Sequence, residues 1–107
     1  MREHARITVA ECDVETTSRK SYRGYRFAKS DRAVVLAADA LARCGYEPTY
    51  ELSGGAADAN VFNERGLECV NLANGMTDIH TPNEHIAVGD LEAMVDVTLA
   101  LLDAALA

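Results

Sequence analysis

The fold is decided by residues 30–72, SDRAVVLAADALARCGYEPTYELSGGAADANVFNERGLECVNL, in which helix-like and strand-like patterns alternate. Ser30 is a favourable N-cap for a helix over residues 31–44, and Gly45 is placed to end that helix in the left-handed conformation. The alanines of this segment give the helix a small-residue face that can pack closely on a sheet. Residues 47–52 then predict a short strand.

The same alternation continues along the chain. Residues 58–65 predict a short helix stopped by Gly66, and residues 67–72 form a compact apolar run, which is typical of a buried strand. Residues 74–83 predict a loop. In the last segment, residues 91–106, apolar side chains recur at the three-, four- and seven-residue spacing of one helical face. The order of these elements predicts the α/β class, with strands sandwiched by helices.

The first 27 residues follow a different pattern. Residues 5–14 alternate with a period of two, which predicts one strand exposed on at least one face. Residues 13–20 are polar and predict a turn or a frayed extension, and residues 22–27 predict an extended segment. We therefore place a domain boundary near Phe27.

Composition limits the classes of function. The chain has 107 residues and a formal charge of −7, so it lacks the net basic face of a nucleic-acid-binding protein. No apolar run approaches the roughly 18 residues of a membrane helix, and residues 1–13 lack the apolar core of a secretory signal. The three cysteines are irregularly spaced, which favours reduced thiols over a metal knuckle or a disulfide framework. A cytoplasmic protein is expected.

Two stretches contain residues suited to chemistry. The turn SGGAADAN at residues 53–60 could let a ligand approach the backbone, or it could be an ordinary tight turn with Asp58 capping the next helix. His80 lies in a loop after the second predicted strand and could bind a metal, or it could be an ordinary surface histidine. One histidine cannot hold zinc, because three or four ligands are required.

Four motifs occur in one order: SGGxxDAN at 53–60, NERGL at 63–67, VNLxxGM at 70–76 and IHTxxEHI at 79–86. With the amphipathic helix that follows them, they resemble the end of peptidase T-like enzymes. These enzymes belong to the aminoacylase and carboxypeptidase family of dizinc metallopeptidases. The resemblance is close over residues 53–102 and looser over residues 5–52.

The resemblance implies a zinc-binding α/β sandwich, a mixed sheet flanked by helices, interrupted by a smaller lid domain. Residues 1–27 would be the last strand of the lid or dimerisation domain and a crossover, and residues 28–107 would close the catalytic domain. His80 matches the family's last metal ligand, and Glu84 matches a carboxylate that supports the same loop. The positions that match the border of the substrate pocket are Gly54, Gly55, Asp58 and Asn60.

The activity implied by the resemblance is hydrolysis of amide bonds in small peptides or N-acyl amino acids. Two zinc ions would activate a water whose proton a glutamate accepts. The other metal ligands and the glutamate have no counterpart in this chain, so we expect it to be inactive and to bind zinc weakly without a missing N-terminal half. Exposed strand edges and apolar faces would favour self-association into a homo-oligomer.

Two other interpretations stay open. The chain could be a non-catalytic α/β module for dimerisation or binding. Alternatively, His80 and His85 from two copies could share a zinc ion at a dimer interface.

Overall fold

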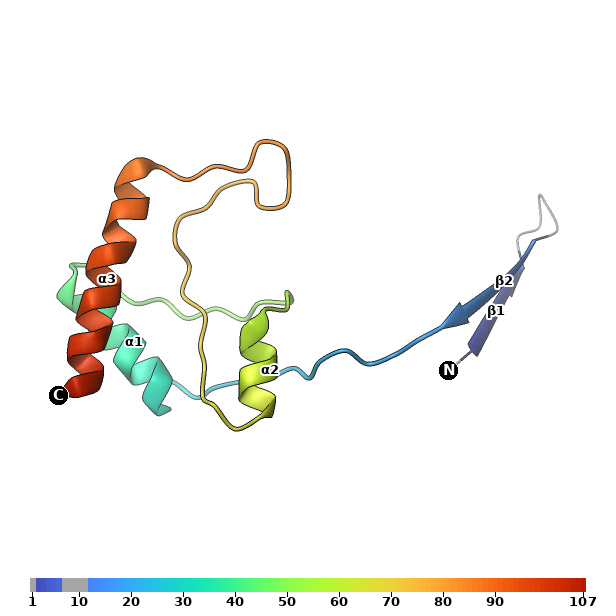
Figure 1. Cartoon of the computed structure of the whole chain (residues 1–107), viewed down its shortest axis with the longest axis horizontal. Coiled ribbons are helices and arrows are strands. Elements are labelled where there is room, and N and C mark those ends of the chain that lie inside the picture. Colours follow the sequence, from blue (N-terminus) through green and yellow to red (C-terminus); the bar gives the residue numbers. More distant parts are fainter. Residues whose placement is uncertain (1, 7–11) are drawn as a thin grey trace.

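The computed structural model describes residues 2–6 and 12–107, which form an elongated molecule with its helices at one end and a β-hairpin at the other (Figure 1). Its extents are 63 × 35 × 18 Å and its radius of gyration is 19.7 Å. A compact domain of this length would have a radius of gyration of about 13 Å. The chain is therefore far more open than a self-contained domain.

The described residues form three helices, and all three were predicted: α1 at Arg32–Arg43, α2 at Asp58–Glu64 and α3 at Val88–Leu106. The N-cap of α1 is Asp31, one residue beyond the predicted Ser30, and it caps no N–H of the helix with its side chain. Its Oδ2 instead accepts a hydrogen bond from the Ala28 N–H at 2.7 Å.

Glycines end the first two helices as predicted. Gly45 and Gly66 have φ angles of 85° and 86°, the left-handed conformation that costs glycine little. After α1, the Tyr46 N–H reaches back to the Leu41 carbonyl at 3.0 Å, which satisfies one of the free carbonyls at the helix end.

The N-terminal segment corrects one prediction. Two strands, β1 at Arg2–Arg6 and β2 at Asp13–Thr17, pair antiparallel with Arg2 opposite Thr17. A single strand over residues 5–14 is therefore wrong, as is a turn beginning at Asp13, and residues 7–11 lie outside the described part. A period of two is common to both strands of a hairpin, so the pattern alone could not show where the chain reverses.

The predicted strands at residues 47–52 and 67–72 are extended, but neither is part of a sheet. Among residues 2–6 and 12–107, the one sheet is the two-stranded β1–β2. A strand needs a hydrogen-bonded neighbour, and among the described residues no ladder of backbone hydrogen bonds joins either stretch to another segment. The described residues combine helices and strands, and the one sheet they form is the hairpin β1–β2.

The core lies mainly between α1 and α3 and is small. No large side chain is fully buried among the described residues, and the buried apolar ones are Ala37, Ala40, Ala59, Val97 and Ala104. The chain exposes 8997 Å², whereas a compact protein of its mass exposes about 5,800 Å².

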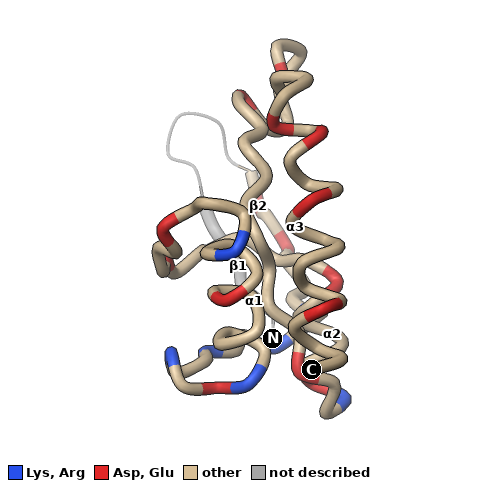
Figure 2. The backbone as a smooth tube through the Cα atoms, turned by 90° about the vertical axis from the view of Figure 1, so that its left-hand side faces the viewer, with Lys and Arg blue, Asp and Glu red and all other residues tan. Residues whose placement is uncertain are grey.

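Helix α3 is apolar on two faces, and only one of them is covered. Val97 and Ala104 are buried toward α1, whereas Leu91, Val95 and Leu99 on the face predicted from periodicity are more than half exposed. Figure 2 shows acidic positions spaced along α3, and its sequence contains no lysine or arginine. A helix that is apolar on both sides usually lies between two layers, and here one layer is missing.

No helix within the described part of the chain combines the length and apolar content of a membrane span.

Candidate functional site

The loop that contains His80 is closed by its own backbone. Thr77 and His85 exchange two hydrogen bonds, with N···O distances of 2.9 and 3.1 Å. Between them, Asp78 and His80 adopt left-handed conformations, with φ angles of 54° and 64°. Such angles are uncommon outside glycine and indicate that surrounding contacts hold the backbone in place.

Two side-chain hydrogen bonds provide those contacts. The Glu84 carboxylate accepts a hydrogen bond from the His80 N–H at 2.8 Å, and the Asp78 carbonyl accepts one from the Thr81 hydroxyl at 2.6 Å. A carboxylate bound to a backbone N–H is a charge-assisted bond, which is stronger than a neutral one. Glu84 therefore fixes the backbone from which the His80 imidazole projects.

The His80 side chain is exposed, and its ring has no hydrogen-bond partner within the described part of the chain. The same residues contain no group of three or more His, Cys, Asp or Glu that could hold a metal ion. His80 thus provides one ligand where zinc needs three or four. The residues that the structure describes do not, on their own, fit a zinc ion.

His85 lies at the end of the same loop. Its Nδ1 is 2.7 Å from the carbonyl oxygen of Asn83. A carbonyl only accepts, so Nδ1 carries the proton, and in the neutral ring Nε2 keeps a free lone pair. The loop therefore contains two exposed imidazoles, His80 and His85.

The glycine turn is more open than the sequence suggested. The Ser53 hydroxyl accepts a hydrogen bond from the Gly55 N–H at 3.2 Å, and a Cβ on Gly54 would meet nothing within 4 Å. Nothing within this chain therefore requires glycine at position 54. The N-cap of α2 is Ala57, so Asp58 is the first helical residue and not the cap.

Asn60 has a structural role. It is 6% exposed, its Oδ1 accepts a hydrogen bond from the Ala57 N–H at 3.0 Å, and its Nδ2 donates to the Arg23 carbonyl at 2.9 Å. The side chain thereby ties the start of α2 to the extended segment that leads from the hairpin. We find no free polar atom on Asn60 aimed at a ligand.

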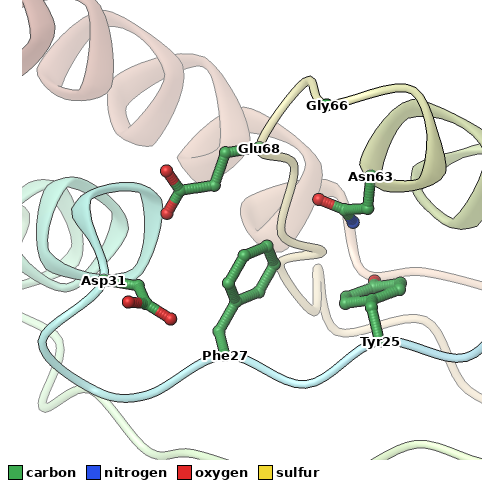
Figure 3. Close-up of a pocket in the computed structure, with 6 residues that line it drawn as sticks. All are labelled: Tyr25, Phe27, Asp31, Asn63, Gly66 and Glu68. Atoms are coloured by element: carbon green, nitrogen blue, oxygen red, sulfur yellow. The ribbon is translucent and has the colours of Figure 1, made fainter.

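A larger cavity of about 400 Å³ lies between the extended segment, the start of α1 and the end of α2 (Figure 3). A second of about 160 Å³ adjoins it. The smaller one is lined by Asn60, and neither of these two cavities is lined by His80 or the glycine pair. The residues that line the larger cavity are Tyr25, Phe27, Asp31, Asn63, Gly66 and Glu68.

Several polar groups around the larger cavity hold the backbone. Glu68 Oε1 accepts a hydrogen bond from the Ala33 N–H at 3.0 Å, which caps the first turn of α1. The Asn63 amide bonds both the N–H and the carbonyl of Cys69, at 2.8 and 2.7 Å. These bonds tie the end of α2 to the segment that follows it. Glu68 was not predicted as a cap, because it lies 35 residues from its partner and no local pattern marks it.

Comparison with known proteins supports the resemblance. The model of peptidase family M20/M25/M40 matches residues 2–104. The uncharacterized protein YqjE of Bacillus subtilis strain 168 is 33% identical over 90% of this chain, and succinyl-diaminopimelate desuccinylase of Halorhodospira halophila is 34% identical over 78%. The crystal structure of aminopeptidase PepT from Bacillus cereus has a TM-score of 0.74 and 38% identity over 78% of this chain.

The match is to a part of each relative. The chain spans 25% of YqjE, 23% of the desuccinylase and 22% of PepT. The arrangement of helices and extended segments is therefore one that occurs within much longer proteins. With a family model that covers nearly all of it, this chain belongs to the peptidase M20/M25/M40 family, as a peptidase T-like member.

Proposed function

We propose that this chain contributes His80 as one ligand to the metal centre of a dizinc peptidase whose other ligands lie outside it. The observation that carries the proposal is the closed loop of residues 77–85, in which the Glu84 carboxylate holds the His80 backbone while the imidazole stays exposed and unpaired. Proteins commonly orient a metal-binding histidine through a hydrogen bond to a neighbouring group. Here the Glu84 carboxylate makes such a bond to the His80 backbone.

The reaction we propose for the complete protein is hydrolysis of an amide bond in a small peptide or an N-acyl amino acid. Two similar proteins support this range: one is named an aminopeptidase and the other a succinyl-diaminopimelate desuccinylase. This chain alone is proposed to be inactive, since a single imidazole neither holds two metal ions nor accepts a proton at a defined water.

The division of the chain is also a proposal. Residues 1–27 would belong to the lid or dimerisation domain and its crossover, and residues 28–107 to the end of the catalytic domain. The extended segment between β2 and α1 and the separation of the hairpin from the helices support it (Figure 1). A cytoplasmic location stays a prediction.

The test uses a protein in which the stretch of Bacillus cereus PepT that matches this chain is replaced by this chain, here called the PepT fusion. Zinc content and hydrolysis of a peptide substrate of PepT are measured for the fusion, for its His80→Ala variant and for its His85→Ala variant. We expect His80→Ala to lower hydrolysis by roughly two orders of magnitude and to release zinc, because a ligand is lost. The matched control His85→Ala should stay close to the unmodified fusion.

Unchanged zinc content and hydrolysis in His80→Ala would show that His80 is not a ligand. A zinc titration of the isolated chain completes the experiment. Tight binding that requires both His80 and His85 would favour a site shared between two copies. Strong self-association with no response of the fusion to zinc would favour a non-catalytic module.

A further inference from the structure

The segment between β2 and α1 changes character at Arg23. Residues 18–22 are exposed, and within the described part of the chain they make no hydrogen bond, ion pair or ring contact. From Arg23 onward the chain is bonded first to α2 and then around the start of α1 (Figure 1). The contacts of Arg23 therefore decide where the attached part of the segment begins.

Arg23 is held to α2 by its backbone and by its side chain. Its carbonyl accepts a hydrogen bond from Asn60 Nδ2 at 2.9 Å, and its Nε lies 3.6 Å from the Glu64 carboxylate. The Arg23 and Glu64 side chains are 71% and 45% exposed, and ion pairs so exposed contribute little. Asn60 is buried, so its hydrogen bond is shielded from water and is the stronger of the two contacts. Asn60 thus provides most of the attachment at Arg23.

The contacts that follow Arg23 do not replace this attachment. Asn71 Nδ2 lies 3.5 Å from the Tyr25 hydroxyl, which is long for a hydrogen bond. The Tyr25 and Phe27 rings are 5.5 Å apart, but both belong to the segment itself. Loss of the Asn60 bond should therefore loosen the chain from Arg23 toward Phe27.

The two polar groups of the Asn60 side chain have separate roles. Oδ1 accepts the Ala57 N–H at 3.0 Å, which is one half of a capping box and is local to α2. Nδ2 reaches the Arg23 carbonyl, 37 residues away in the sequence, and adds nothing to the helix. Substitution can separate the two roles, because an aspartate keeps the acceptor and loses the donor.

We infer that Asn60 is a positioning residue, which through the Arg23 carbonyl fixes the point where the hairpin-bearing segment leaves the helices. In the complete protein, where residues 1–27 are proposed to belong to a lid, a fixed attachment would lower the cost of ordering that part when substrate binds. For this consequence the inference rests on the proposed function. The attachment itself does not depend on His80 or on zinc.

The basic residues of the segment provide cleavage sites for a test with trypsin, which needs the chain around the cut bond to be locally free. In the isolated chain, cleavage after Arg26 should be about tenfold slower than cleavage after Arg19, as measured by mass spectrometry. Asn60→Asp should raise the rate after Arg26 by about fivefold, the effect of one hydrogen bond, and leave the rate after Arg19 unchanged. Asn60→Ala, which removes the donor without adding a charge, should raise the rate after Arg26 at least as much.

Asn63→Asp is the matched control, because it makes the same chemical change three residues later on the same helix. It removes the hydrogen bond to the Cys69 carbonyl and leaves the Arg23 carbonyl bonded. Cleavage after Arg26 should stay within about twofold of the unmodified chain. Cleavage after Arg43, at the end of α1, reports on general unfolding and should not change in any of these variants.

The PepT fusion tests the consequence for substrate binding. Asn60→Asp should raise KM by about threefold to fivefold, with kcat within about twofold and zinc content unchanged, since the metal loop is not touched. The His80→Ala fusion should show the opposite pattern: lost zinc and hydrolysis with an unchanged rate of cleavage after Arg26. The two patterns separate a failure of this inference from a failure of the proposed function.

Several results would overturn the inference. One is an unchanged rate after Arg26 in both Asn60 variants. Another is an equal rise in Asn63→Asp, or a rise after Arg43 as large as that after Arg26, because the fold and not the attachment would then have been lost. In the fusion, an unchanged KM would overturn the positioning role, as would a fall in kcat alone, which would place Asn60 at the reacting groups.

Discussion

Replacing Glu84 should release the His80 backbone from its left-handed conformation. The carboxylate accepts the His80 N–H at 2.8 Å, and a charge-assisted bond at such an exposed site contributes about 1 to 1.5 kcal/mol. The left-handed conformation costs a non-glycine residue roughly 1–2 kcal/mol, so the bond offsets most of that cost. Without this hydrogen bond, the population of left-handed His80 relative to extended His80 should fall by about tenfold.

Glu84→Ala and Glu84→Gln are compared by exchange of the His80 amide in the isolated chain and by zinc affinity in the PepT fusion. Alanine should abolish protection of the His80 amide. It should also weaken zinc binding by about tenfold, because removing a group that supports a metal ligand commonly has an effect of that size. Glutamine keeps an acceptor without charge and should be intermediate. Glu47→Ala, at an exposed carboxylate far from the loop, serves as the control. Retention of the full zinc affinity and of the His80 amide protection in Glu84→Ala would refute the argument.

Three further changes test the structure of the chain itself. Asn63→Ala removes both hydrogen bonds to Cys69 and should lower the protection of the Cys69 amide by roughly 30-fold, corresponding to about 2 kcal/mol. Asn63→Asp keeps the acceptor for that amide and should lower its protection less. Glu68→Ala removes the cap on Ala33 and should destabilise α1 by about 1 kcal/mol, seen as faster exchange in its first turn; an unchanged exchange rate would contradict the cap. Gly45→Ala places a side chain at a φ angle of 85° and should cost about 1 kcal/mol, measured as lost helical circular dichroism on heating, with Gly54→Ala as a control that should have little effect.

The helices were predictable because their signals are local. Capping residues, terminal glycines and a repeat of three to four residues lie within one or two turns of each other, and they define a helix whatever surrounds it. The start of α1 shifted by one residue, from Ser30 to Asp31, because Asp31 is bonded to the Ala28 N–H within the preceding turn. Such a shift at a helix end is ordinary.

The strands were harder to predict because a strand is a property of two segments. Residues 47–52 and 67–72 were predicted as strands, but among the described residues neither is part of a sheet. In the N-terminal segment, the alternation did not show that residues 2–6 and 13–17 pair as two strands. Similarly, periodicity showed that α3 is apolar, but it could not show which face contacts α1.

Among the site residues, sequence motifs singled out His80 and Glu84, and the structure shows a hydrogen bond between the Glu84 carboxylate and the His80 N–H that no spacing rule required. The role of His80 as a metal ligand stays a prediction. Asn60 was expected at the border of a pocket, and its two hydrogen bonds show that it also joins α2 to the extended segment at Arg23.

The helices α1, α2 and α3, the glycine ends of the first two and the family could all be read from the sequence, because they depend on residues close together along the chain and on motifs in order. Only the folded arrangement shows which face of α3 is covered, that Glu68 caps α1, and that the backbone of residues 47–52 is open. The physical reason is that burial and strand pairing depend on what lies opposite a residue in space, and for much of this chain that opposite surface is water.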